Sequence, residues 1–372
     1  MWRRLAPLPV LAALAVAPIV AQTDATDEFI RAQMAAQNIP GLSLAVLRDG
    51  EILKTAGYGV ADRESGAPAT PETVYKIASV SKPILAMGVL LLVDEGRIAL
   101  DDPVTRYLEG APAAWEGITI RHLLTHTSGL IREGPGFAAG KVQPDAEVIR
   151  SAYDRPLVFE PGARWEYSNL GYFALAEVTR VASGRPWTEF FDERIFEPLG
   201  MASTWPTNTG EAVMDRATGY TDNDRLIPGK DWPALRPSGA FLSTVLDLAK
   251  LDAALGDGRI LADSTRRAMW TAVTLGDGSP HPFGLGWQLA EENGRRVAYH
   301  TGGMSGFRSG FARFLDDGLS VIVLLNLDDV DLHTILFGVA RLYLSESGSE
   351  AGRSGLVRGP PAVATSARGS NG

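Results

Sequence analysis

Hydrophobic and polar positions follow one pattern at the two ends of the chain and another in its middle. Residues 25–37 repeat apolar side chains near helical spacing, which predicts a helix. Residues 41–62 contain two β-rich runs that flank Asp49-Gly50, and this dipeptide is a strong signal for a two-residue hairpin turn. The first element after the helix is therefore a predicted β-hairpin.

The last third of the chain repeats this pattern. Strand-like runs at 295–301 and 310–327, the second divided by a turn at 316–318, precede a helical pattern at 331–344. The middle of the chain is mostly helical in pattern, with long loops. We therefore predict an α/β fold (an α+β sandwich): one antiparallel sheet built from both chain ends, flanked by the terminal helices, with an inserted, mainly helical lobe.

The two termini lack the patterns of a folded domain. Arg3 and Arg4 precede the apolar stretch 5–20 and the small residue Ala21, which is typical of a secretory signal peptide. This stretch is shorter than the roughly 20 residues that a membrane span needs. We expect residues 1–21 to be removed, which predicts a periplasmic or secreted protein; an uncleaved membrane anchor is the alternative.

Residues 346–372 lack aromatic side chains and are rich in Gly, Ser, Ala and Pro, so we predict a disordered tail. Residues 22–345 remain as one folded unit. A chain of 372 residues with 45% hydrophobic residues is long enough for a large core, as one domain or two lobes.

Charge and cysteine content exclude several classes of function. A net charge of −9 argues against nucleic acid as a partner, because phosphate neutralisation needs a basic surface. The chain has no cysteine, which excludes disulfides, thiolate metal sites and a cysteine nucleophile.

Ser79 and Lys82 lie at the start of a predicted buried helix, 79–96, whose apolar residues lie nearly all round. A helix start offers Ser79 free backbone N–H groups and places Lys82 one turn on, on the same face. A desolvated lysine can act as the base that a serine nucleophile needs. The alternative is a helix-capping serine followed by a solvated lysine.

Two later segments supply matching groups. Tyr167 and Asn169 form the chain's only Y-x-N triplet; the tyrosine could relay the serine proton and the asparagine could hold Lys82 and a substrate amide. The small residues 301–303 at a strand edge could let a substrate backbone lie alongside and donate an N–H to an oxyanion. Each segment alone is equally consistent with a turn or a strand end.

A metal hydrolase is a second interpretation, because His122 and His126 lie four apart on a possible helix face. A catalytic zinc site needs a third ligand, and the chain has no H-E-x-x-H motif. Histidines that brace the core or a loop are the favoured interpretation, and we expect no metal and no cofactor.

Taken together, "ASVSK" (78–82), "YSN" (167–169) and "HTG" (300–302) resemble the motifs of the serine β-lactamase and penicillin-binding protein superfamily. The similar branch contains class C β-lactamases, R61-type D-Ala-D-Ala carboxypeptidases, and related esterases and D-aminopeptidases, and the resemblance covers residues 26–345. The resemblance implies that Ser79 is the acylated nucleophile, Lys82 its base and Tyr167 the proton relay. It implies further that Asn169 is a substrate amide ligand and that His300 and Thr301 belong to the substrate-side strand. The implied oxyanion hole consists of the backbone N–H groups of Ser79 and Gly303.

The resemblance implies a serine hydrolase that cleaves ester or amide bonds through an acyl-enzyme, with a small-molecule or short-peptide acyl substrate. A class C-like β-lactamase and a non-catalytic penicillin-binding or scaffold protein are the alternatives. Candidate walls of the cleft are residues 219–237 and four aromatic side chains: Tyr153, Trp165, Trp287 and Phe307.

His300 departs from the class C pattern, which has lysine there. A histidine near its reference pKa of about 6.5 is mostly uncharged at neutral pH, so it anchors a substrate carboxylate less well. As the pH falls through that pKa, we expect the ring to become cationic. The kcat/KM of carboxylate-bearing substrates should then rise relative to that of neutral esters.

Overall fold

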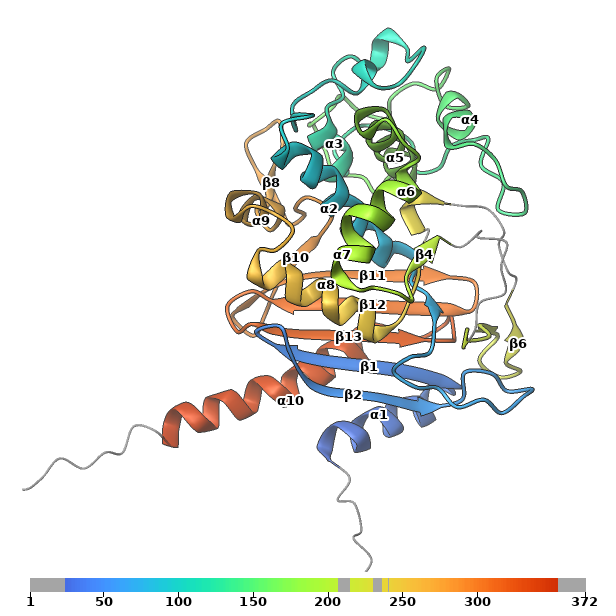
Figure 1. The fold of residues 1–372 in the computed structure, drawn as a ribbon, viewed down its shortest axis with the longest axis vertical. Coiled ribbons are helices and arrows are strands. Elements are labelled where there is room, and N and C mark those ends of the chain that lie inside the picture. Colours follow the sequence, from blue (N-terminus) through green and yellow to red (C-terminus); the bar gives the residue numbers. More distant parts are fainter. Residues whose placement is uncertain (1–23, 207–214, 230–235, 240, 354–372) are drawn as a thin grey trace, which may run out of the picture.

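The computed structural model describes residues 24–206, 215–229, 236–239 and 241–353, and its centre is a six-stranded antiparallel sheet (Figure 1). The strand order is β10-β11-β12-β13-β1-β2. The strands are β1 (Gly41–Arg48), β2 (Glu51–Gly59), β10 (Gln288–Glu292), β11 (Arg295–Met304), β12 (Phe307–Phe314) and β13 (Leu319–Leu325). Because β1 pairs with β13, the two ends of the chain share one sheet, which confirms the predicted architecture.

The first hairpin forms where the turn residues predicted it. Asp49 and Gly50 have φ values of 51° and 82°, both in the left-handed region that a two-residue hairpin turn of this kind requires. The register between β1 and β2 shifts between Val46 and Leu47, so a bulge lies just before the turn.

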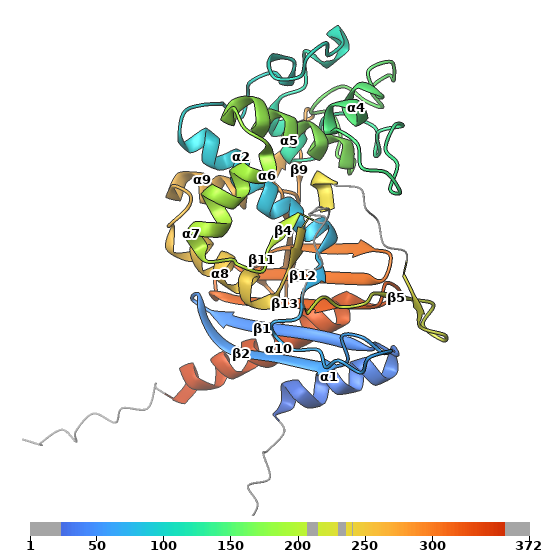
Figure 2. The same ribbon diagram turned by 45° about the vertical axis from the view of Figure 1, so that its right-hand side comes forward.

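The terminal helices α1 (Ala25–Ala36) and α10 (Leu332–Arg353) cover one face of the sheet (Figure 2). Strand β1 shows the alternation that this arrangement needs: Leu42, Leu44 and Val46 pack toward these helices, whereas Ala45 and Leu47 belong to the core on the other face. The sheet is therefore buried on both sides.

Helix α10 continues to Arg353, so residues 346–353, which we expected in a disordered tail, are helical. The predicted signal peptide and residues 354–372 lie outside the described residues. None of the described helices is long and apolar enough to span a membrane.

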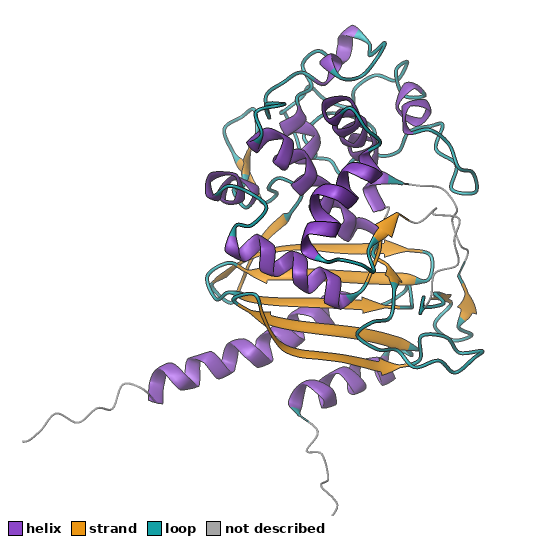
Figure 3. Cartoon of the chain, in the orientation of Figure 1, coloured by secondary structure: helices purple, strands orange, loops and turns teal. Residues whose placement is uncertain are grey.

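The second face carries α8 (Val245–Asp257) and the inserted helical lobe (Figure 3). The other helices are α2 (Ser81–Asp94), α3 (Ile120–Leu124), α4 (Asp145–Arg150), α5 (Asn169–Ser183), α6 (Trp187–Phe191), α7 (Glu197–Leu199) and α9 (Asp263–Met269). Short strands are β3 (Tyr75–Lys76), β4 (Trp205–Pro206), β5 (Tyr220–Thr221), β6 (Ile227–Pro228), β7 (Phe241–Ser243), β8 (Val273–Thr274) and β9 (Pro280–His281). Single turns are η1 (Ala78–Val80), η2 (Val104–Arg106), η3 (Ala113–Trp115), η4 (Asp192–Phe196, a π-helical turn) and η5 (Pro237–Gly239).

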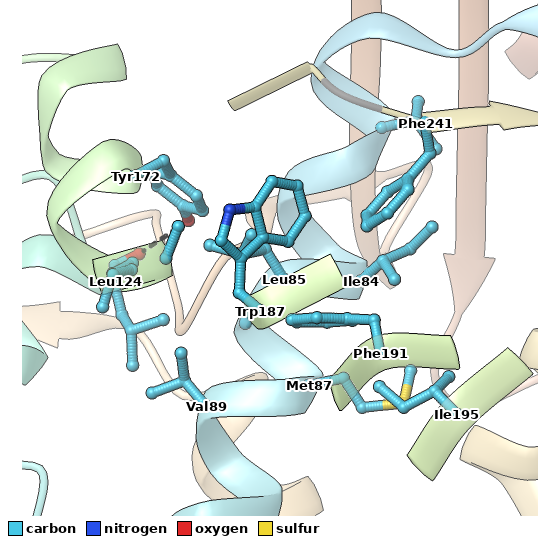
Figure 4. Close-up of a cluster of buried hydrophobic side chains, with 14 of the residues drawn as sticks. Ile84, Leu85, Met87, Val89, Leu124, Tyr172, Trp187, Phe191, Ile195 and Phe241 are labelled. Carbon is cyan, nitrogen blue, oxygen red and sulfur yellow. Dashed lines mark hydrogen bonds between the residues drawn. The ribbon is translucent and has the colours of Figure 1, made fainter. Parts of the chain in front are cut away.

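Helix α2 is the axis of the lobe, and its side chains are buried from Ser81 to Leu92 (Figure 4). Gly88 has no room for a Cβ, because the Phe191 ring from α6 would lie 2.3 Å away. A helix that is apolar on all sides is stable only when other elements enclose it, as here. The predicted helix 79–96 is wrong at its start: Ser79 lies in the preceding 3₁₀ turn η1, and α2 begins at Ser81.

Candidate active site

Hydrogen bonds to the backbone of β7 and to a side chain of β12 hold the turn that carries Ser79. The Ile77 N–H donates to the Phe241 carbonyl at 3.1 Å, and the Ser309 hydroxyl donates to the Ile77 carbonyl at 2.6 Å. Ala78 adopts φ 44°, a left-handed conformation that is costly for a residue with a Cβ. Ala78 is the first residue of η1, so the strained residue directly precedes Ser79.

Strand β11 passes directly beside this turn. A Cβ on Gly302 would lie 2.2 Å from Ser309 Oγ, 2.4 Å from the Ile77 carbonyl oxygen and 3.0 Å from the Ser79 nitrogen. Only glycine permits such a close approach of two backbones. The small-residue strand edge predicted at residues 301–303 therefore lies alongside Ser79.

Lys82 is completely buried beneath Ser79, with three oxygens around its amine. The Nζ atom lies 3.2 Å from Ser79 Oγ, 2.9 Å from Asn169 Oδ1 and 2.7 Å from the Ser238 carbonyl oxygen. Burial, with the charges of Arg236 and Arg132, holds the pKa of Lys82 well below its usual value, and Glu133 opposes this shift. The environment therefore favours the neutral amine.

The chemical identity of these three oxygens determines where the N–H groups and the lone pair of the Lys82 amine point. A neutral amine has two N–H groups and one lone pair, and the Asn169 and Ser238 oxygens can only accept hydrogen bonds. When both N–H groups point at these acceptors, the lone pair is left for the Ser79 hydroxyl. The Lys82 amine is thus oriented as a base toward Ser79.

The Tyr167 ring adjoins both Ser79 and Lys82. The Lys82 Nζ atom lies 4.7 Å from the ring centroid. Burial raises the pKa of Tyr167 to about 12, although a hydrogen bond with Ser79 and the charge of Arg132 oppose this shift. Tyr167 is therefore a neutral phenol in the resting site, able to donate or pass on a proton.

His126 supports Tyr167 from the core, with ring centroids 4.3 Å apart. Its Nδ1 accepts the Ser168 N–H at 3.2 Å. His122 Nδ1 accepts the Thr119 N–H in a capping box at the start of α3. Both histidines brace backbone, and the described part of the chain contains no group of three or more His, Asp or Glu side chains that could hold a metal ion.

Asn169 begins α5 and is held on both sides of its amide. Its Oδ1 accepts from Lys82, and its Nδ2 donates to Glu133 Oε1. The same Glu133 oxygen accepts from Arg236 Nη2, while Arg236 Nε donates to Ser238 Oγ at 3.0 Å. This network fixes the amide with its oxygen toward Lys82.

His300 on β11 is 1% exposed. Its Nδ1 lies 2.8 Å from the Thr301 carbonyl oxygen, and its Nε2 is buried without a hydrogen-bond partner. Burial and the charge of Lys82 lower the pKa of His300 to about 3. The expectation that this ring becomes cationic just below pH 6.5 is therefore wrong, because the reference pKa applies to a solvated ring.

A cleft of about 490 Å³ opens above these groups, and six of the seven predicted site residues line it: Ser79, Tyr167, Asn169, His300, Thr301 and Gly303. Lys82 lies buried beneath it. Sequence reasoning missed Arg132, Glu133 and Ser238, which also line the cleft, whereas Arg236 belongs to the predicted wall segment 219–237. Arg132 and Glu133 stand on the loop after α3, and Ser238 lies in the short turn η5, so no hydrophobic periodicity or motif marked them.

The predicted cleft walls are only partly correct. Trp165 lines the cleft, where its ring stacks on His281 at 4.8 Å between centroids. Trp287 and Phe307 are buried in the core, and Tyr153 lines a separate cavity beside α4. Residues 230–235 of the segment 219–237 lie outside the described residues.

The beta-lactamase family model matches residues 26–342. The chain belongs to the beta-lactamase family. Among its relatives, the chain is 38% identical over 212 residues to the esterase EstB of Burkholderia gladioli, a match that covers 52% of this chain and 53% of the esterase. It is 30% identical over 299 residues to a D-aminopeptidase of Gluconobacter oxydans, covering 77% of this chain and 56% of that protein.

The solved structures agree with this assignment. The octameric penicillin-binding protein homologue from Pyrococcus abyssi superimposes with a TM-score of 0.77 at 29% identity, covering 86% of this chain and 77% of the homologue. This beta-lactamase family member spans just over half the length of the esterase and of the D-aminopeptidase. Its fold and its membership of a family that includes esterases and D-aminopeptidases are thus shown.

Proposed function

We propose that the protein is a serine hydrolase that cleaves ester or amide bonds of small acyl substrates through an acyl-enzyme on Ser79. The observation that carries the proposal is the buried Lys82 amine, with two obligate acceptors and the Ser79 hydroxyl around it. A base with a pKa near the working pH is what activates a serine nucleophile.

In the proposed first step, the Ser79 hydroxyl proton moves to Lys82 Nζ while Ser79 Oγ bonds to the substrate carbonyl carbon. The backbone N–H groups of Ser79 and Gly303 would stabilise the oxyanion. As the C–O or C–N bond of the substrate breaks, Tyr167 donates its phenolic proton to the departing alcohol or amine and takes up the proton held by Lys82. In the second step, water attacks the acyl carbon, the bond from that carbon to Ser79 Oγ breaks and the acid is released. The proton that the water loses goes to Ser79 Oγ, which restores the resting site.

Esters and D-amino-acid amides are the substrate classes that the relatives' names support. The neutral, buried His300 gives β11 no positive charge for a substrate carboxylate, which disfavours a class C-like β-lactamase as the main activity. A non-catalytic role is disfavoured because the amine, the phenol and the hydroxyl lie together with compatible protonation states.

The test compares Ser79→Ala with Ser81→Ala. Ser81 is the matched control, because its hydroxyl accepts the Phe241 N–H at 3.1 Å inside the lobe. Ser79→Ala should lower hydrolysis of 4-nitrophenyl butyrate by on the order of a thousandfold or more and abolish the fluorophosphonate adduct in intact mass. Ser81→Ala should keep both, and Lys82→Ala should cost nearly as much as Ser79→Ala. Wild-type turnover or labelling in Ser79→Ala would refute the proposal.

A further inference from the structure

Arg132 stands at the mouth of the cleft, on the loop that leads from α3 toward α4. Its carbonyl oxygen accepts the N–H groups of Asn169 at 2.8 Å and Leu170 at 3.2 Å, which ties this loop to the start of α5. Its side chain is exposed, and its Cζ lies 5.1 Å from the centroid of the Tyr167 ring. The guanidinium is therefore held close to the reacting groups while it remains open to solvent.

The charges around Arg132 leave it without an anionic partner. Within the described ranges of the chain, no carboxylate lies within ion-pair distance of its guanidinium. The other cleft arginine, Arg236, is already paired with Glu133, and Glu133 also accepts from Asn169. Arg132 is thus the uncompensated cation among the described side chains that line the cleft.

Strand β11, which also lines the cleft, does not supply this charge. His300 is 1% exposed, its Nδ1 lies 2.8 Å from the Thr301 carbonyl oxygen, and burial lowers the pKa of its ring to about 3, so the ring carries no positive charge at neutral pH. A planar guanidinium is the side chain best suited to hold a carboxylate, through two parallel hydrogen bonds.

We propose that Arg132 binds a carboxylate group of the substrate, so that the protein prefers acyl substrates with a free carboxylate over their neutral counterparts. Arg132 is then a specificity-determining residue, and the preferred substrates are monoesters of dicarboxylic acids or acylated amino acids and short peptides. This inference rests on the proposed acyl-serine function and adds the substrate class to it.

The experiment uses two pairs of compounds that differ only in charge. The first pair is mono-4-nitrophenyl adipate and its methyl ester, compared as substrates by kcat/KM. The second pair is N-acetyl-D-alanine and its amide, compared as inhibitors of neutral ester hydrolysis. In wild type, the charged member of at least one pair should be favoured, and the responding pair identifies the side of the scissile bond on which the carboxylate lies.

Arg132→Gln should lower that preference about ten- to a hundredfold, since a charge-assisted hydrogen bond pair is lost. Arg132→Lys should keep part of it. Arg164→Gln is the matched control: this exposed arginine packs over the Phe159 ring with 4.9 Å to the centroid, does not line the cleft, and should leave the preference unchanged.

A change of Lys82 basicity in Arg132→Gln affects both members of a pair equally, so the ratio reports carboxylate binding alone. No preference in wild type, or an equal preference in wild type and Arg132→Gln for both pairs, would overturn the inference. Neutral ester hydrolysis that survives Ser79→Ala would instead overturn the proposed function, so the two failures are distinguishable.

Discussion

The Lys82 amine lies between two oxygens that only accept hydrogen bonds and one hydroxyl that can donate. Charged side chains at the cleft then adjust its basicity in opposite directions. Arg236 and Arg132 lower the pKa of Lys82 in addition to burial, and Glu133 raises it. At the scale of single residues, the chemistry of the cleft depends on this balance.

Glu133→Gln and Arg236→Gln should shift the pH profile in opposite directions. Without the Glu133 charge, the two arginines act unopposed, the pKa of Lys82 falls further, and the acid limb of kcat/KM should move to lower pH. Without the Arg236 charge the pKa rises, and that limb should move to higher pH. We expect shifts of about half to one pH unit, measured with a neutral aryl ester. Shifts of the same sign would show that Lys82 is not the titrating base.

Sequence reasoning located the motif residues, because each motif carries its chemistry within three or four positions. It did not locate Arg132 or Glu133, whose place beside Ser79 depends on the path of a loop, and it placed Arg236 only within the wall segment 219–237. It also gave His300 a solvated pKa, since the burial of one ring on a strand depends on elements that pack over it from elsewhere in the chain.

At the scale of elements, the cleft forms where β11 meets η1, and Gly302 sets the distance between them. Its φ lies outside the left-handed region, so only the lack of space forbids a side chain there. The contact joins the sheet to the helical lobe directly beside Ser79.

Gly302→Ala should therefore push β11 away from Ser79. We expect a loss of about 1–3 kcal/mol in the free energy of unfolding and a lower kcat, because backbone atoms cannot yield as a side chain would. Gly140→Ala is the control, since Gly140 has no heavy atom within 4 Å of its added Cβ and no positive φ. Its unfolding free energy should change by less than about 0.5 kcal/mol. Urea denaturation measures the free energy of unfolding, and steady-state kinetics measures kcat. If Gly302→Ala matches the wild type in both, β11 can move away from Ser79 without cost.

The elements themselves were largely predictable where local signals act. The Asp49-Gly50 turn and the two β-rich runs that flank it predicted the first hairpin, and helical spacing predicted α1 and α10. The start of α2 was missed because the left-handed Ala78 is imposed by partners such as Ser309, which lies 232 positions away from Ile77. No pattern within a short window contains that contact.

At the scale of the whole molecule, two buried neutral histidines make the fold sensitive to acid. Burial holds the pKa of His126 well below its usual value and lowers that of His300 to about 3, whereas the unfolded chain takes up these protons near pH 6.5. Between those values the unfolded state binds more protons, so stability rises with pH and is lost as the pH falls. Asp145 has the opposite effect on stability. Burial raises its pKa to about 7, so the folded state binds this proton more tightly than the unfolded state, and stability falls as the pH rises toward 7.

His300→Gln should remove one of these contributions. Between pH 5.5 and 4.5, the wild type should lose about 1.4 kcal/mol more unfolding free energy than the variant, since one proton is taken up only on unfolding. The difference between the two proteins cancels every other titrating group, including His126 and Asp145. Urea denaturation at both pH values provides the measurement, and parallel losses would show that the His300 ring is protonated in the folded protein.

The pairing of β1 with β13 has a consequence for the order in which the protein becomes competent during synthesis. A ribosome has already made Ser79, Lys82, Tyr167 and Asn169 when about half of the chain is complete, yet β11, β12 and β13 are still untranslated. Until they emerge, the free edge of β1 has no neighbour, and the turn before Ser79 lacks the hydroxyl of Ser309 that holds it. We therefore expect a nascent or prematurely terminated chain that stops before residue 295 to lack the proposed hydrolase activity, which would begin only once translation is nearly finished.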